Sequence, residues 1–132
     1  MNLVILDTHV WIWWINQDEK LPLSFHERIT NSRRAAISAV SVYELIQVVR
    51  RGRLSLTIEV NEWLHMATVE ADIDIIPVSA RIAQIAANLP RIHGDPLDRL
   101  IIASALSNNK PLFSLDGKFA GYPDLSGLLF TQ

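Results

Sequence analysis

The sequence predicts an α/β fold in which a mostly parallel sheet of about four or five strands lies between layers of helices. Short apolar runs typical of buried strands alternate with longer segments typical of helices along almost the whole chain. The chain has 132 residues, enough to bury a sizeable core without disulfides. We therefore expect one domain over residues 1–132, with helices on both faces of the sheet.

The predicted strands are short and separated by helix-length segments. The first, NLVIL, is apolar almost throughout, as expected for a strand buried on both faces. In chain order the strands are expected at 2–6, 35–38, 73–77, 112–115 and, as a last edge strand, 127–130.

The predicted helices fill the intervals between these strands. The segment that begins at Ser41 carries its apolar side chains on one stripe, and Gly52 is expected to follow its end. Pro96 suits the first position of another helix, after a loop with the sequence LPRIHGDP. The helices are expected at 8–16, 23–32, 41–51, 58–71, 79–88 and 96–109.

Composition excludes several classes of protein. The net charge is -2, so the chain as a whole is not a basic nucleic-acid binder. The absence of cysteine excludes a disulfide scaffold, a thiol nucleophile and a zinc ribbon, and it suits a cytoplasmic protein. The first residues, MNLVILD, lack a basic start and are too short for a signal peptide or a membrane span.

Four acidic residues are expected at one edge of the sheet. Asp7 and Asp116 come directly after strands, while Glu44 and Asp98 stand near the starts of long helices. In a parallel sheet those strand ends and helix starts meet at the carboxyl edge. Helix capping is the competing interpretation, because Ser41 with Glu44 forms a capping box and Asp7 or Asp116 could each cap a turn.

Convergence of four carboxylates would favour a divalent cation. The negative charges repel one another, and a hard cation such as Mg²⁺ or Mn²⁺ relieves that repulsion through oxygen ligands. The lack of cysteine and of spaced histidine pairs argues against zinc. Such a metal lowers the pKa of a bound water and stabilises charge on a phosphate, and a free carboxylate can accept the water proton.

These segments resemble the PIN-domain family, and most closely its VapC-type toxins. The matching pieces are LDTH at the start, SAVSVYEL, IHGDPLDRLIIASA and FSLDGKF, in this order and over about the whole chain. The resemblance implies a PIN-like three-layer fold and a Mg²⁺- or Mn²⁺-dependent endoribonuclease. It also implies a homodimer and a cognate antitoxin whose tail covers the active site. The family's catalytic and metal-binding acids fall on Asp7, Glu44, Asp98 and Asp116.

Five further residues lie beside these acids in the sequence. Asp95 is either an accessory acid or the N-cap of the helix that follows. Thr8 and Ser114 could hydrogen-bond the acids or a metal-bound water. Arg99 could pair with a carboxylate or bind phosphate, and His93 could reach the substrate or hold a loop hydrogen bond.

Tryptophans and arginines suggest contact surfaces. Three tryptophans near the N-terminus could stack on RNA bases, although a core or a partner surface is the favoured interpretation. The arginine corner after residue 49 is expected to contact the RNA backbone, or else an acidic antitoxin tail. The residues concerned are Trp11, Trp13 and Trp14, and Arg50, Arg51 and Arg53.

Two other functions remain open. A small-molecule phosphohydrolase would also place an aspartate after a strand, but its second aspartate is missing, because that position holds His9. A non-catalytic module that binds RNA or protein would use the acids only as caps. Titration with Mn²⁺ separates this module from a metalloenzyme.

Overall fold

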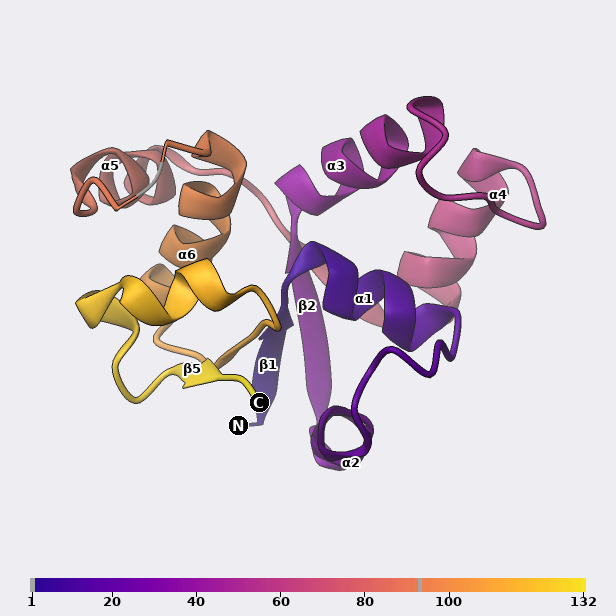
Figure 1. Ribbon diagram of the computed structural model, residues 1–132, viewed down its shortest axis with the longest axis horizontal. Helices are drawn as coiled ribbons and strands as arrows, with labels where there is room; N and C mark the ends of the chain where they lie inside the picture. The colour runs from indigo at the N-terminus through magenta and orange to yellow at the C-terminus, as the bar shows by residue number, and fades with distance from the viewer. Residues whose placement is uncertain (1, 93) are drawn as a thin grey trace.

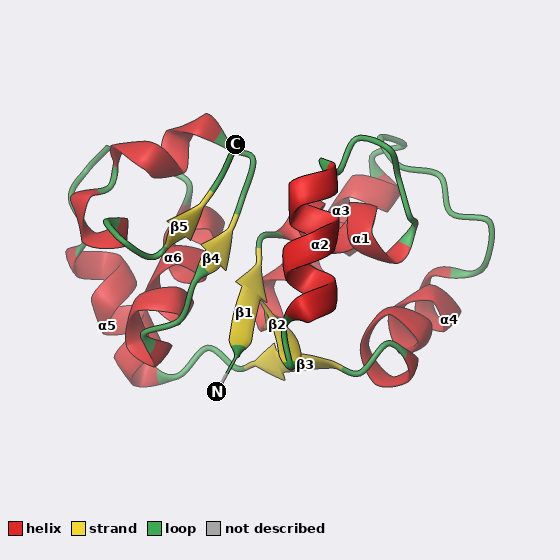
Figure 2. Cartoon of the chain, turned by 90° about the horizontal axis from the view of Figure 1, so that it is seen from below, coloured by secondary structure: helices red, strands yellow, loops and turns green. Residues whose placement is uncertain are grey.

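Five parallel strands form the sheet expected from the sequence (Figure 2). The computed structural model describes residues 2–92 and 94–132. The strand order is β3-β2-β1-β4-β5. The bounds are β1 (Leu3–Leu6), β2 (Arg34–Ser38), β3 (Ile73–Ile76), β4 (Leu112–Phe113) and β5 (Leu129–Phe130). The predicted fold class is confirmed, and the strands near the C-terminus are shorter than expected.

Helices connect the strands and cover both faces of the sheet (Figure 1). They are α1 (Thr8–Ile15), α2 (Leu23–Asn31), α3 (Ala39–Arg50), α4 (Val60–His65), α5 (Ala80–Asn88) and α6 (Pro96–Asn108). A π-helical turn, Met66–Glu70, continues α4, and two 3-10 turns, Gly117–Gly121 and Pro123–Leu125, precede β5. In the described part of the chain, no helix has the length and apolar character needed to cross a membrane.

The core lies in two layers, one on each side of the sheet. Within β1, Val4 and Leu6 belong to the cluster that contains residues of α1, α2, α3 and α4, whereas Ile5 belongs to the cluster of α6 and the 3-10 turns. This alternation follows from the two-residue period of a strand. A sheet buried on both faces therefore explains why the first strand is apolar at consecutive positions.

Helix α3 begins two residues earlier than expected, and its N-cap lies three residues earlier. Its N-cap is Ser38, the last residue of β2, whose Oγ accepts a hydrogen bond from the backbone N–H of Val40 at 3.2 Å. Ser41 is buried inside the helix, so the expectation that it caps the helix was wrong. Glu44 consequently lies beyond the first turn, and the capping interpretation does not account for it.

The chain changes direction across the sheet at β1. It passes from β1 outward to β2 and β3, and then returns through α5 and α6 to place β4 on the other side of β1. Ligand sites in parallel sheets lie beyond the carboxyl ends of the strands at such a switch point. Here those ends lead directly to Asp7 and to the segment Ser114–Asp116.

Candidate metal and active site

A pocket of about 450 Å³ lies at this switch point. It is lined by residues from α1, α3, the start of α6 and the segment after β4. The structure brings together in this pocket the five acids considered above, namely Asp7, Glu44, Asp95, Asp98 and Asp116.

Asp7 is held at both carboxylate oxygens. It is the N-cap of α1, with Oδ1 accepting from the backbone N–H of Thr8 at 2.8 Å. Oδ2 accepts from the hydroxyl of Ser114 at 2.8 Å. The Ser114 hydroxyl oxygen in turn accepts from the backbone N–H of Asp116 at 3.0 Å. Ser114 therefore joins the ends of β1 and β4 and fixes the orientation of a carboxylate that is only 7% exposed.

Glu44 is positioned through a pair of hydroxyl groups. Thr8 Oγ1 donates to Glu44 Oε1 at 2.5 Å, and the same oxygen lies 2.8 Å from Ser41 Oγ. Because the single proton of Thr8 points to the carboxylate, Ser41 donates to Thr8. Ser41 thus links α3 to α1 beneath the pocket.

The remaining acids begin helical turns. Asp95 is the N-cap of α6, with Oδ1 accepting from the backbone N–H of Leu97 at 3.0 Å, so its expected capping role is confirmed. Asp98 lies in the first turn of α6 and is 8% exposed. Asp116 caps the next 3-10 turn through the N–H of Lys118, at 3.0 Å from Oδ1. Capping and pocket lining therefore coexist in Asp7, Asp95 and Asp116.

The carboxylates are poorly compensated. Burial raises the pKa of Asp7 and of Glu44 above their usual values, and hydrogen bonds from Ser114 and Thr8 only partly oppose this. Burial, followed by the charge of Asp95 and the other acids of the pocket, raises the pKa of Asp98 to about 7. The ionised form of these carboxylates is therefore unfavourable unless a cation compensates their charge.

A family model described as the PIN domain matches residues 4–125. The chain belongs to the PIN-domain family. The match includes all four of the principal acids, from Asp7 to Asp116.

Individual relatives of this PIN domain are similar over nearly their full length. Ribonuclease VapC22 of Mycobacterium tuberculosis is 29% identical over 123 residues, which cover 92% of this chain and 93% of the relative. VapBC2 from Rickettsia felis, solved with a DNA fragment from its promoter, has a TM-score of 0.71 at 23% identity and 98% coverage of each chain. VapBC-5 from Mycobacterium tuberculosis, of the VapBC family of toxin–antitoxin systems, has a TM-score of 0.60 at 26% identity. It covers 99% of this chain and 98% of its own.

The donor set of the PIN domain fits a hard divalent cation. Every acid of the pocket offers oxygen, and three of them have raised pKa values that a cation would lower. Within residues 2–92 and 94–132, no group of three or more acidic or histidine side chains is placed so that it could hold a metal ion by itself. Mg²⁺ suits such an open arrangement, because it keeps several of its waters when it binds to carboxylates.

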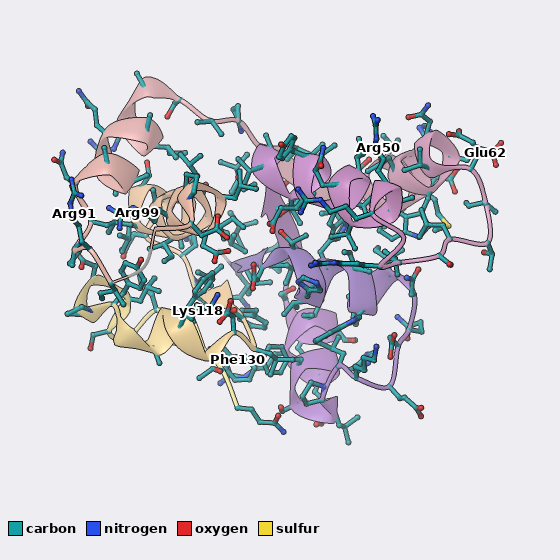
Figure 3. All side chains as sticks on the ribbon, turned by 45° about the horizontal axis from the view of Figure 1, so that its top comes forward. Arg50, Glu62, Arg91, Arg99, Lys118 and Phe130 are labelled. Carbon is teal, nitrogen blue, oxygen red and sulfur yellow. The ribbon has the colours of Figure 1, made fainter. Side chains whose placement is uncertain are left out.

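Arg99, one of the expected accessory residues, does not line the acidic pocket. Among the described residues, Arg99 pairs with no carboxylate; its guanidinium donates to the carbonyls of Ala86, Leu89 and Pro90 at 2.9, 2.7 and 2.8 Å. It therefore holds the end of α5 against α6, where it lies near Arg91 (Figure 3). His93 lies outside the described residues.

The three arginines of the arginine corner lie in different places. Arg53 lines the acidic pocket, whereas Arg50 and Arg51 are exposed outside it. Figure 3 shows Arg50 over α3, well away from Lys118 on the C-terminal segment. Lys118 also lines the pocket, as does His9, and sequence reasoning assigned neither to the site. The sequence feature that points to His9 and Lys118 is their position, since each follows an aspartate of the pocket by two residues.

Proposed function

We propose that this protein is a metal-dependent endoribonuclease and the toxin of a toxin–antitoxin pair. The observation that carries the proposal is the pocket of five acids at the switch point of a PIN fold. The similarity to a protein named ribonuclease VapC22 supports RNA as the substrate. Asp7, Glu44, Asp98 and Asp116 are the residues assigned to hold Mg²⁺ or Mn²⁺.

The groups of the pocket have different roles in the proposed hydrolysis. The ion, when bound, lowers the pKa of water and stabilises charge on the phosphate. Ser114 and the N–H of Thr8 hold Asp7 in one orientation, and the Thr8 hydroxyl does the same for Glu44. Fixed carboxylates of this kind need little reorganisation during the reaction. A carboxylate that the ion does not fully engage accepts the water proton.

A cleavage assay tests the proposed function. Purified protein is expected to cut a long single-stranded RNA internally with Mg²⁺ or Mn²⁺ and to stop when a chelator is in excess. Undiminished cleavage in chelator would contradict the metal-dependent mechanism. Turnover of a generic phosphomonoester without any effect on RNA would favour a phosphohydrolase. No thermal shift with Mn²⁺, together with no cleavage, would favour a non-catalytic binding module.

We infer a cytoplasmic homodimer with a cognate antitoxin as its partner. The similarity to VapBC-5, a member of the VapBC family of toxin–antitoxin systems, supports the antitoxin partner. Co-expression with the protein encoded by the adjacent reading frame is expected to restore growth that this chain alone arrests. Co-purification of the two proteins and the mass of the complex measure the partnership directly.

Arg53 is expected to contribute more to RNA binding than its neighbours. Its guanidinium lines the acidic pocket, where it can pair with the phosphate adjoining the cleaved one. Arg53→Ala is expected to lower kcat/KM about tenfold at low salt, with a smaller loss at high salt, because a phosphate contact is weakened by salt. Arg50→Ala is the matched control, since Arg50 is exposed outside the pocket. Equal losses in the two variants would show that the corner acts only through its overall charge.

A further inference from the structure

The three tryptophans of α1 lie in three different surroundings. Trp11 is buried, donates from Nε1 to the carbonyl of Ala67 at 3.0 Å and packs edge-on against Trp63, so it belongs to the core. Trp14 is half-buried and lies against His26, with ring centroids 5.5 Å apart. Trp13 is also half-buried, but it lines the acidic pocket. The core expected from the sequence thus accounts for Trp11, and it leaves the pocket side of Trp13 unexplained.

Trp13 forms part of an apolar wall in an otherwise charged pocket. Val10, one turn earlier in α1, and Leu115, after β4, line the pocket with it. His9 lies four residues before Trp13 on the same face of the helix, with ring centroids 5.8 Å apart and planes at 56°. The other side of Trp13 packs against the hydrophobic core, so the indole is supported from behind. The result is a supported aromatic ring beside five carboxylates.

A phosphodiester that reaches the carboxylates brings its nucleobases into the same pocket. An aromatic ring binds any of the four bases through its face, because every base has a π surface. We propose that Trp13, with His9 beside it, is the surface on which the base next to the scissile phosphate stacks. This proposal rests on the proposed ribonuclease function and adds a base subsite to it. The subsite requires a base that is unpaired and turned out of its helix.

A basic peptide is the competing occupant, because carboxylates and a tryptophan face both attract a cationic side chain. With a divalent cation on the carboxylates, as the proposed function requires, the remaining charges of the pocket favour RNA. Arg53 and Lys118 line the same pocket as Trp13, and two cations suit the phosphates on either side of a cleaved bond. The same two cations repel a basic peptide.

Kinetics on an RNA that lacks one base test the subsite. The cleaved bond of a short single-stranded RNA is first mapped with the wild-type protein and Mn²⁺. Two further RNAs then carry an abasic nucleotide on one or the other side of that bond. Trp13→Leu, Trp13→Phe and Trp14→Leu are compared with the wild type on all three RNAs. Trp14→Leu is the matched control, because Trp14 is half-buried on the same helix and lies outside the pocket.

Trp13→Leu is expected to lower kcat/KM on the intact RNA by about 10- to 100-fold, the range for loss of one stacked base. Trp13→Phe is expected to keep most of the activity, and Trp14→Leu to stay within about twofold of the wild type. The wild type is expected to lose a similar factor on one of the abasic RNAs. Trp13→Leu is expected to show little further loss of kcat/KM on that RNA. In this variant the base has no indole to stack on, so removing the base takes away no further interaction.

Several outcomes would overturn the subsite. One is wild-type activity of Trp13→Leu on the intact RNA. Another is a full additional loss of Trp13→Leu on both abasic RNAs, since the base and the indole would then act independently. A third is unchanged RNA kinetics together with weaker binding of an arginine-rich peptide, which would assign the wall to a protein partner.

Failure of the ribonuclease function is a separate result. In that case the wild-type protein cleaves no RNA with Mn²⁺, and the proposed base subsite is rejected together with the ribonuclease function. Thermal unfolding of each variant shows whether a loss reflects folding. If Trp13→Leu unfolds at a much lower temperature than Trp14→Leu, the test uses Trp13→Phe and the wild type instead. Equal wild-type kinetics on the intact and both abasic RNAs then overturn the proposal.

Discussion

Asp7→Asn is expected to reduce the rate of RNA cleavage by at least about 1,000-fold, which corresponds to about 4 kcal/mol of transition-state stabilisation. Asp7 is the most firmly held carboxylate of the pocket, with one hydrogen bond to each oxygen. The neutral amide removes a negative ligand from the proposed metal site. Initial rates on a mapped RNA, with Mn²⁺ in excess, measure the effect.

The same variant is expected to remain folded. The asparagine oxygen can still accept from the N–H of Thr8, and the hydroxyl of Ser114 can turn to accept from the new amide. Asp18→Asn is a suitable control, because Asp18 also accepts a backbone N–H, that of Lys20 at 2.9 Å, but lies outside the pocket. Cleavage by Asp7→Asn at the rate of Asp18→Asn would contradict the assignment of the site.

The metal-free protein is expected to be less stable at pH 8 than at pH 5.5. The pKa of Asp98 rises from 3.8 in the unfolded chain to about 7 in the folded one, mainly because of burial. Between these values the folded protein holds more protons than the unfolded chain, so the free energy of unfolding falls as the pH rises. Above about pH 7 the Asp98 carboxyl is ionised in the folded protein, and the full loss in the free energy of unfolding is present. Burial raises the pKa of Asp7 and Glu44 as well, and their effect has the same sign.

Thermal unfolding in chelator measures this penalty. Asp98→Asn is expected to raise the melting temperature of the metal-free protein at pH 8 by about 5 to 10 °C, while it lowers activity. The difference between the variant and the wild type is expected to shrink at pH 5.5. Mn²⁺ at pH 8 is expected to stabilise the wild type, because the ion compensates the carboxylates.

Asp124→Asn provides the control for that experiment, because Asp124 is an exposed acid outside the pocket. Its melting temperature is expected to follow that of the wild type at both pH values. Greater stability of the metal-free wild type at pH 8 than at pH 5.5 would contradict the idea of an uncompensated acidic pocket. An equal gain from Asp124→Asn would show that net charge, and not burial of Asp98, is the cause.

Most of the fold followed from patterns that are local in the sequence. The apolar run of β1 and the regular return of helical segments were enough to predict a parallel sheet covered on both faces. The start of α3 was not predictable in this way, because Ser38 and Ser41 both suit an N-cap. Strand pairing decided between them, since β2 pairs with β3 as far as Ser38 and Ile76, and the helix begins directly afterwards.

The site was predictable where it depended on strand ends. Asp7 and Asp116 follow strands, and a parallel sheet brings such positions together. Arg99 follows Asp98 in the sequence, but the described structure pairs it with backbone carbonyls and not with a carboxylate. Successive residues of a helix point roughly 100° apart, so Arg99 points to the carbonyls at the end of α5 while Asp98 lines the pocket. The positions of Arg53 and Trp13 beside the pocket depend on how α1 and α3 pack against each other, and local sequence patterns do not predict this packing.

The hydrogen bond between Ser114 and Asp7 joins positions that are 107 residues apart. During synthesis Asp7 emerges from the ribosome long before Ser114 and Asp116. The first carboxylate of the pocket therefore lacks its hydrogen bond from Ser114 until the residues after β4 have been made. An interrupted chain that stops before β4 carries Asp7, Glu44 and Asp98 but no complete pocket. The pocket can thus be assembled only after β4 and the residues that follow it have been synthesised.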